Sequence, residues 1–388
     1  MSRVILSGMQ VLIEKHFVRD LAVVIENECI KNIIPVNMIH NHLPAIHHEF
    51  SSDHYLVPGF IDLHIHGTHG RDVMDATEES LLAMSRTLAA DGVTGFLATT
   101  MSASNDAIGA ALKNIAKQMA NKQGAAILGA HLEGPFISKT NCGAQCADHA
   151  RLPDIEVLRK WQDENNQVIK KVTLAPELPG SLEMIAALGK MDVIASIGHT
   201  HATYQETCDA IAYGCTQATH LFNAMGAIHQ RQPGALTALL LAKQIDAEII
   251  VDGVHLHPAI IELIYRLKGK DGLFLVTDAM RAKCLGDGEY ELGGQAVTVN
   301  KGEARLANGV LAGSTLRLPQ AILNMVTFTK CSLVDAVYMA TVNPAKALGL
   351  SDRKGSIAVG KDADLVILDA AFDVHLTLRG GREIYKKH

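Results

Sequence analysis

The sequence predicts an α/β fold in which a (β/α)8 TIM-like barrel carries a small discontinuous β-sandwich domain formed by both termini. From Phe60 onward, eight apolar stretches alternate with amphipathic ones at intervals of roughly 23 to 43 residues, which is the spacing of βα units. The hydrophobic content is 48% and the aromatic content 4%, a balance typical of buried parallel strands with aliphatic side chains. A length of 388 residues accommodates one barrel with an appendage.

The predicted barrel strands begin near Phe60, Gly92, Ala126, Ile169, Asp192, Cys215, Ala247 and Gly272. Apolar residues at three- and four-residue spacing predict helices between them, over 77–90, 106–120, 155–164, 203–213 and 258–267. Eight alternations with right-handed crossovers close most simply into a barrel. An open doubly wound sheet is the alternative, but the segment after the first strand, Gly67-Thr68-His69-Gly70, does not fit its usual Gly-x-Gly-x-x-Gly pattern.

Short predicted strands occupy both ends of the chain, over 3–6, 10–13, 21–26 and 29–35 and again after residue 354. Neither set has enough strands for independent stability, so the two sets are expected to pair. We therefore expect a β-sandwich domain from 1–57 and 354–388 and a barrel domain over 58–353. Elsewhere the sequence predicts a solvated histidine-rich loop at 39–48, a hairpin-like insertion at 290–311, and helices at 316–327 and 333–348.

The charge and cysteine content exclude several classes of partner and site. A formal net charge of -6 and a pI near 6.3 argue against nucleic acid and anionic membranes, because both need a basic surface. The sequence has no apolar run of about 18 residues and no signal peptide, so a cytoplasmic location is expected. Seven cysteines, an odd number without Cys-x-x-Cys spacing, are expected to be reduced thiols.

The first predicted barrel strand ends in Asp62-Leu63-His64-Ile65-His66. Because side chains alternate along a strand, Asp62, His64 and His66 point to one side, although such a pair of histidines also fits an exposed hairpin. Other strands end in similar residues, and these ends meet at one face of a barrel. The other endings are His131-Leu132-Glu133, Gly198-His199-Thr200-His201, Thr219-His220-Leu221-Phe222-Asn223, Asp252-Gly253-Val254-His255 and Thr277-Asp278-Ala279.

A ring of His, Glu and Asp predicts a catalytic metal site, because converging polar groups would lack partners without an ion or a substrate. Ligands of these types suit Zn, Fe, Co, Mn and Ni alike. Asp278 fits either an acid/base role or the N-cap of a helix over 279–283, and its place at a strand end favours catalysis. Arg231 fits either a phosphate clamp or an exposed arginine before a helix.

Several longer motifs are similar to those of one enzyme family. They are Pro58-Gly59-Phe60-Ile61-Asp62, His131-Leu132-Glu133-Gly134-Pro135-Phe136, Gly198-His199-Thr200, Ala218-Thr219-His220-Leu221-Phe222-Asn223-Ala224-Met225, Asp252-Gly253-Val254-His255, Val276-Thr277-Asp278-Ala279 and Leu311-Ala312-Gly313-Ser314-Thr315. Over nearly the whole chain the sequence resembles the metal-dependent amidohydrolases. Within them it resembles the N-acetylglucosamine-6-phosphate deacetylases and their relatives acting on N-acetylgalactosamine 6-phosphate.

The resemblance implies an enzyme that hydrolyses N-acetyl-D-glucosamine 6-phosphate, or its galacto epimer, to the amino sugar 6-phosphate and acetate. It implies one or two divalent ions as cofactors. The principal metal position matches Glu133, His199 and His220. The second matches His64 and His66.

Other roles follow from the same resemblance. Asp278 matches the catalytic acid/base, and a homodimer is implied in which Arg231 can reach the neighbour's site. Some relatives carry His at position 145, where this chain has Gln145, so no proton-transfer role is expected there. The positions that match substrate contacts are Ala144, Asn223, Ala224, Arg231, Asp252, His255, Leu311, Ala312 and Gly313.

The chemistry of the amide hydrolysis that the resemblance implies can also be argued from the residues themselves. A metal ion lowers the pKa of water and polarises the carbonyl, and a carboxylate such as Asp278 moves the proton to the departing nitrogen. His255 either donates a hydrogen bond to the carbonyl oxygen or holds the phosphate. Two alternatives are another amidohydrolase activity, often with a carboxylated lysine on the fourth strand where this chain has 172–177, and a non-enzymatic scaffold, which the intact ligand set disfavours.

Overall fold

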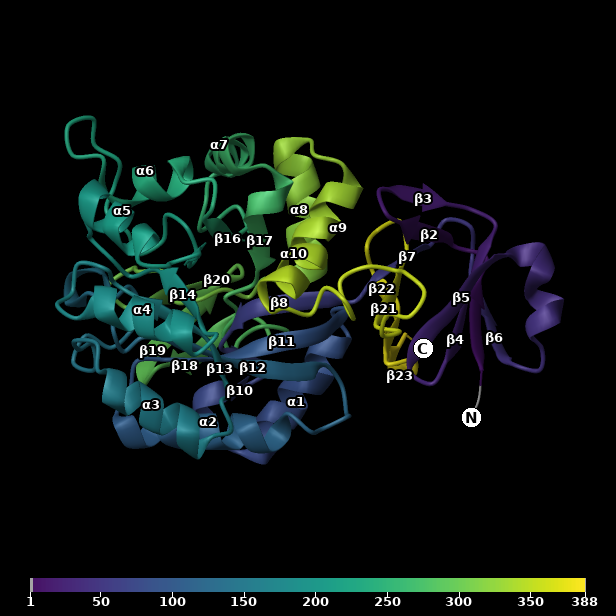
Figure 1. The fold of residues 1–388 in the computed structure, drawn as a ribbon, viewed down its shortest axis with the longest axis horizontal. Helices are drawn as coiled ribbons and strands as arrows, with labels where there is room; N and C mark the ends of the chain where they lie inside the picture. The colour runs from purple at the N-terminus through teal and green to yellow at the C-terminus, as the bar shows by residue number, and fades with distance from the viewer. Residues whose placement is uncertain (1–2, 388) are drawn as a thin grey trace.

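The computed structural model describes residues 3–387, and its central feature is a sheet of eight parallel strands (Figure 1). The strands follow one another around the sheet in chain order, as β8 (Phe60–Ile65), β11 (Val93–Thr100), β12 (Ala126–Glu133), β13 (Ile169–Leu174), β14 (Ile194–Ile197), β15 (Gln217–Ala218), β16 (Asp246–Ile250) and β17 (Leu273–Val276). All eight lie within two residues of their predicted starts. The predicted barrel is confirmed.

Helices connect and cover these strands. They are α1 (Glu78–Ala89), α2 (Asn105–Gln118), α3 (Ile155–Glu164), α4 (Ser181–Lys190), α5 (Tyr204–Ala212), α6 (Gly234–Leu241), α7 (Pro258–Lys268), α8 (Leu318–Thr329), α9 (Leu333–Ala340) and α10 (Val342–Ala347). Polar residues fix several helix starts. For example, the Thr77 and Ser104 side chains each accept a hydrogen bond from a backbone N–H in the first turn of α1 and α2.

The prediction of one helix over 333–348 was wrong, because the chain forms α9 and α10 with a break at Thr341. The backbone of Thr341 has φ -133° and ψ -71°, outside the helical region. Pro344 explains the break. Its nitrogen carries no hydrogen, and its ring would collide with the carbonyl of Ala340 in a continuous helix.

The first and last strands of the barrel sheet, β8 and β17, meet through a small set of hydrogen bonds. The Thr277 hydroxyl donates to a carboxylate oxygen of Asp62 over 2.6 Å. The Asp278 N–H donates to the His64 carbonyl over 2.9 Å, and Ile65 forms an isolated parallel bridge with Ala279. This seam closes the barrel and holds the end of β8 beside Asp278.

Two further sheets pack against each other beside the barrel (Figure 1). One has the order β5-β4-β1-β6, with bounds β1 (Val4–Ser7), β4 (Leu21–Glu26), β5 (Cys29–Pro35) and β6 (Ile46–Glu49). The other has the order β23-β22-β21-β7-β2-β3, with bounds β2 (Gln10–Ile13), β3 (His16–Val18), β7 (Tyr55–Pro58), β21 (Leu365–Leu368), β22 (Val374–Arg379) and β23 (Arg382–Lys386).

The second of these sheets joins the two ends of the chain, because β7 pairs with both β2 and β21. The sheets share one apolar core, in which Leu6 and Val23 of the first pack with Leu56 and Ile367 of the second. The predicted pairing of both termini in a β-sandwich is therefore confirmed. The exact division at 57/58 and 353/354 stays a prediction.

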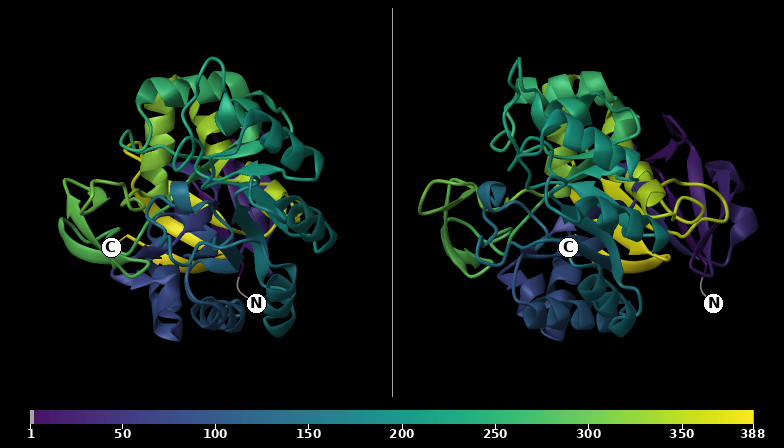
Figure 2. Two further views of the ribbon diagram at one scale, coloured as in Figure 1. Left: turned by 90° about the vertical axis from the view of Figure 1, so that its left-hand side faces the viewer. Right: turned by 60° about the vertical axis from the view of Figure 1, so that its left-hand side comes forward.

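The remaining elements lie outside these layers. The hairpin-like insertion predicted at 290–311 forms a three-stranded antiparallel sheet of β18 (Gly288–Leu292), β19 (Gln295–Asn300) and β20 (Glu303–Leu306). In the right-hand view of Figure 2 this green sheet lies on the opposite side of the barrel from the purple N-terminal sheet. A short pair, β9 (Gly67–Thr68) and β10 (Arg71–Asp72), follows β8.

The histidine-rich segment 39–48 is only partly the expected loop. Its first residues end a 3-10 helix (Val36–His42), and its last ones begin β6, which pairs in parallel with β1. All seven cysteines are free thiols, in agreement with the expectation. Among residues 3–387, the helices are too short or too polar to cross a bilayer.

The hydrogen bond between Thr277 and Asp62 at the seam should contribute to the stability of the fold. Thr277→Val keeps the side-chain shape but removes the hydroxyl that donates to the fully buried Asp62 carboxylate, so the free energy of unfolding should fall by roughly 1–3 kcal/mol. Thr100→Val is the matched control, because the buried Thr100 hydroxyl has no hydrogen-bond partner among the described residues. Thermal unfolding of both variants checks this, and equal midpoints would contradict the role of the seam.

Candidate metal centre and active site

The ends of five barrel strands bring six polar side chains together, as the sequence predicted from the strand-end rule. All six are buried. They are His64 and His66 from β8 and the residue after it, Glu133 from β12, His199 after β14, His220 after β15 and Asp278 after β17.

Glu133 lies at the centre of this cluster. Its Oε1 atom is 3.1 Å from His199 Nε2 and 3.0 Å from His220 Nε2, and these two ring nitrogens are 3.1 Å apart. Such spacing brings one carboxylate oxygen and two imidazole nitrogens to a common point. These three residues form the first candidate ligand group.

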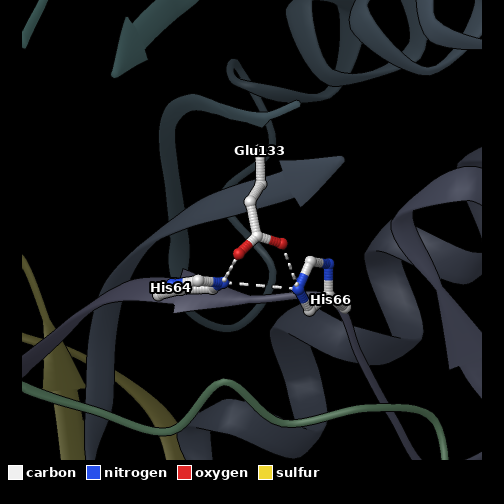
Figure 3. A group of neighbouring side chains, drawn as sticks. All are labelled: His64, His66 and Glu133. Atoms are coloured by element: carbon white, nitrogen blue, oxygen red, sulfur yellow. Dashed lines mark hydrogen bonds and ion pairs between the residues drawn. The ribbon is translucent and has the colours of Figure 1, made fainter. Parts of the chain in front are cut away.

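The second group shares the same carboxylate (Figure 3). The other oxygen of Glu133, Oε2, lies 3.1 Å from His66 Nε2, while Oε1 lies 3.4 Å from His64 Nε2. The Nε2 atoms of the two histidines are 3.3 Å apart. In Figure 3 both rings turn their edges toward Glu133 from β8 and its end.

For two of the rings, those of His66 and His199, the contact on the far side indicates which nitrogen carries the hydrogen. His66 Nδ1 lies 3.3 Å from the Thr99 carbonyl, and His199 Nδ1 lies 3.0 Å from the Asn141 carbonyl. A carbonyl oxygen only accepts, so Nδ1 is the protonated nitrogen and Nε2 offers its lone pair to the cluster. Imidazole lone pairs and a carboxylate aimed at one place are the donor set of a divalent metal, so the residues fit such an ion.

The backbone at the site is strained. His199, His220 and Asp278 have φ values of 49°, 30° and 47°, in the left-handed region that residues other than glycine seldom occupy. Each such residue costs of order 1 kcal/mol or more, and such strain gathers at functional sites. These bends turn the chain sharply at the strand ends and aim the side chains across the barrel mouth.

Asp278 lies beside the second ligand group. Its Oδ1 atom is 3.4 Å from His64 Nε2 and 3.3 Å from His66 Nε2. Burial raises the pKa of Asp278, but the two imidazoles outweigh it and lower that pKa to about 2. The helix N-cap alternative is wrong, because residues 279–285 form a bridge and turns rather than a helix.

A cavity of about 330 Å³ opens above the cluster, and its wall includes most of the expected substrate contacts. Those that line it are Ala144, Asn223, Ala224, His255, Leu311 and Gly313. Three other expected contacts lie elsewhere. Ala312 packs in the apolar cluster under the insertion, Asp252 lies behind His255, and Arg231 is exposed on the loop before α6.

His255 and Asp252 form a hydrogen-bonded pair at the cavity wall. Asp252 accepts hydrogen bonds from the backbone N–H groups of Val254 and His255, and its other oxygen lies 2.6 Å from His255 Nδ1. Burial raises the pKa of Asp252, but its hydrogen bonds with the His255 ring and with two backbone N–H groups, together with the charge of His255, lower that pKa below its usual value. Asp252 thus orients the His255 ring at the cavity wall.

Two polar residues of this cavity, Gln145 and Arg305, were given no role by the sequence analysis. Gln145 donates to Glu133 Oε2 over 2.6 Å and accepts from the Ser102 N–H over 2.6 Å, so it fixes the carboxylate on the side of His66. Arg305, on β20 of the insertion, also lines the cavity, where it is paired with Glu303. No local motif marks either residue, because each reaches the site from a loop or insertion.

Comparison with known proteins agrees with this site. The model of the amidohydrolase family matches residues 55–384. An N-acetylglucosamine-6-phosphate deacetylase of Lysinibacillus sphaericus is 44% identical over 344 residues, covering 88% of this chain and 89% of that protein. One of Bacillus subtilis (strain 168) is 42% identical over 382 residues, covering 95% and 96%.

A solved structure is similar over the whole length. It is a mutant N-acetyl-D-glucosamine-6-phosphate deacetylase of Mycobacterium smegmatis in complex with N-acetyl-D-glucosamine 6-phosphate. The TM-score is 0.92 at 34% sequence identity, and the match covers 100% of each chain. The barrel, the terminal sheets and the insertion therefore belong to one shared architecture.

Proposed function

This chain belongs to the amidohydrolase family and, within it, to the N-acetylglucosamine-6-phosphate deacetylases, and we propose that it hydrolyses N-acetyl-D-glucosamine 6-phosphate to D-glucosamine 6-phosphate and acetate. The observation that carries the proposal is the Asp278 carboxylate beside two imidazoles, at the floor of a cavity with a metal-type donor set. The bond that breaks is the amide C–N bond; water supplies the hydroxyl group of acetic acid and one hydrogen to the nitrogen, which keeps the hydrogen it carried in the amide.

The protein supplies two ligand groups for the metal. Glu133, His199 and His220 would hold one divalent ion, and Glu133 with His64 and His66 would hold another. Zn, Fe, Co, Mn and Ni all suit these ligands. A bound ion supplies Lewis-acid chemistry, since it lowers the pKa of water and polarises the amide carbonyl.

Asp278 is proposed to move the proton. As a carboxylate it takes a proton from the attacking water and then gives it to the nitrogen that leaves as the free amine. The lowered pKa of Asp278 favours the first step, because the group is unprotonated when the substrate arrives. His255, oriented by Asp252, would contact either the carbonyl oxygen or the phosphate.

The phosphate needs a cation that the ligand groups do not provide. Arg231 is exposed in one copy of the chain, so it would reach the phosphate only in the neighbouring site of a homodimer. Arg305 lines the cavity of its own copy but is paired with Glu303. We propose the homodimer arrangement with Arg231 as the phosphate ligand, together with a cytoplasmic location.

An activity that depends on a carboxylated lysine is less well supported. The fourth barrel strand, β13, carries Lys171, but its ammonium group pairs with Glu248 inside the barrel. The two ligand groups contain histidines and Glu133 instead. This arrangement favours the deacetylase over hydrolases that bridge two ions with a modified lysine.

Metal analysis tests the two ligand groups. Glu133→Ala should abolish metal binding, because the carboxylate is common to both groups. His199→Ala and His66→Ala should each lower the number of ions bound, as measured by elemental analysis of purified protein. Wild-type content in His66→Ala would exclude the second ion.

Acetate release tests the reaction and the role of Asp278. Wild-type protein should release acetate from N-acetylglucosamine 6-phosphate faster than from its galacto epimer or from unphosphorylated sugars. Asp278→Asn should lower kcat by about 10²- to 10⁴-fold, because the proton is then left without an acceptor, while metal content stays unchanged. Normal turnover by Asp278→Asn would refute the acid/base assignment, and a faster reaction with the galacto epimer would reassign the substrate.

Paired arginine variants test how phosphate is held. Arg231→Ala should raise KM for phosphorylated substrates at least tenfold and leave that for neutral sugars nearly unchanged, because it removes a charge-assisted contact. Arg305→Ala is the matched comparison within the cavity. If KM for phosphorylated substrates rises selectively in Arg305→Ala and not in Arg231→Ala, phosphate is bound within one copy and not by Arg231.

A further inference from the structure

A buried ion pair that the proposed reaction does not use lies inside the barrel. Lys171 on β13 and Glu248 on β16 pair through Nζ and Oε1, and both side chains have 0% exposure. Removing two charges from water is costly, and their attraction offsets this cost only when further hydrogen bonds satisfy both groups. The remaining oxygen of Glu248 makes such bonds at the candidate metal centre.

Glu248 reaches both ligand groups through that second oxygen. Its Oε2 atom lies 3.0 Å from His64 Nδ1 and accepts from the backbone N–H of His220 over 3.3 Å. His64 belongs to the group with His66, and His220 to the group with His199. One carboxylate beneath the cluster therefore contacts a ligand of each group.

The contact with His64 decides which of its nitrogens faces the ion. A carboxylate that accepts from Nδ1 keeps the hydrogen there and leaves the Nε2 lone pair toward Glu133 and His66. For His66 and His199 backbone carbonyls do the same. His64 lies deeper, and a side chain takes the place of the carbonyl.

Packing holds the His64 ring in the matching orientation. His131 lies edge-on to it, with ring centroids 4.6 Å apart and planes at 90°. Both nitrogens of His131 are engaged by the hydroxyls of Thr99, at 3.3 Å, and Thr173, at 2.7 Å. His131 therefore packs against His64 and is not a ligand. Glu248 is the partner that determines which nitrogen of His64 carries the hydrogen.

We propose that Lys171 and Glu248 form a positioning pair for the metal centre. Glu248 fixes His64 in the tautomer that offers Nε2 to a divalent ion. Lys171 balances the charge of Glu248, so that Glu248 stays ionised in the barrel core and accepts the hydrogen bond from His64. The inference rests on the proposed ligand groups and not on the deacetylase reaction. Neither Lys171 nor Glu248 lines the cavity.

Glu248→Gln tests the pair with little change of shape. The new amide can turn its NH₂ group toward His64 Nδ1, which moves the ring hydrogen to Nε2 and blocks the lone pair. The measurement uses the full chain in a His199→Ala background, where the other group has lost a ligand. There Glu248→Gln should raise the Kd for Zn²⁺ by roughly 10- to 100-fold in competition with a chromophoric chelator.

Stability separates positioning from a purely structural pair. Lys171→Met and Glu248→Gln each leave one buried charge unpaired, so both should lower the thermal midpoint, and the double variant should recover part of the loss. Zn²⁺ affinity should remain weak in a double variant with Lys171→Met and Glu248→Met, because methionine offers no acceptor to His64 Nδ1, whereas a glutamine is free to turn its oxygen there once Lys171 is gone. A pair with only a structural role would recover both properties together.

Lys283→Met is the matched control for removing a buried lysine. Lys283 is also fully inaccessible and pairs with Asp91 at 2.8 Å, and Asp91 keeps a second partner in Arg317. This variant should lose stability without loss of Zn²⁺ affinity.

Two results would overturn the proposal. One is that His199→Ala with Glu248→Gln binds Zn²⁺ with a Kd within twofold of the Kd of His199→Ala alone. The other is that His199→Ala binds no Zn²⁺. Acetate release by the wild type is independent of both results, so they would leave the proposed reaction standing.

Discussion

Closure of the barrel between β8 and β17 is the constraint on which the site depends. The Asp62 carboxylate accepts from the Thr277 hydroxyl, and the next residue, Asp278, donates its N–H to the His64 carbonyl. The same contacts that join the two strands thus bring the proposed acid/base to 3.4 Å or less from His64 and His66. Catalytic geometry and barrel closure share hydrogen bonds, so the residues nearest the chemistry also carry part of the fold's stability.

The ends of the barrel strands hold the candidate ligands, and loops and the insertion form much of the cavity wall. Glu248 and the Thr99 carbonyl hold His64 and His66 from other barrel strands, and the Asn141 carbonyl holds His199 from the loop after β12. The cavity wall, in contrast, comes from loops and from the insertion that carries Arg305. Strained φ values at the strand ends mark the boundary between these two regions. The ends of the barrel strands therefore supply the ligands, whereas loops both form much of the cavity wall and, through Gln145 and Asn141, help to orient Glu133 and His199.

Much of this arrangement could be predicted from local sequence, because strand spacing and strand-end residues are local features. The eight strand starts and the convergence of polar strand ends follow from those features, whereas the choice of Glu133, His199 and His220, with His64 and His66, as the ligands came from the resemblance to a family. Partners far apart in the chain leave no such pattern. Gln145 reaches Glu133 from a loop, and Lys171 meets Glu248 across the barrel between strands that are not neighbours. The prediction of a single helix over 333–348 was wrong for a local reason. It relied on the spacing of apolar residues and did not take into account that Pro344 interrupts a helix.

The charge balance around Glu133 favours a divalent cation. The pKa values of Glu133, Asp278 and Glu248 are all lowered below the usual range despite burial, chiefly by His64 for the first two and by Lys171 for Glu248, which is the carboxylate that pairs with the Lys171 ammonium. Without an ion, the same carboxylates outweigh burial and raise the pKa of His66 to about 9 and that of His64 well above its usual value, so that protons on the rings offset the excess negative charge. Protonated rings cannot offer lone pairs. A divalent cation replaces those protons with equivalent charge and lets the same nitrogens act as ligands, which is why this buried cluster is arranged for a metal rather than for hydrogen bonds alone.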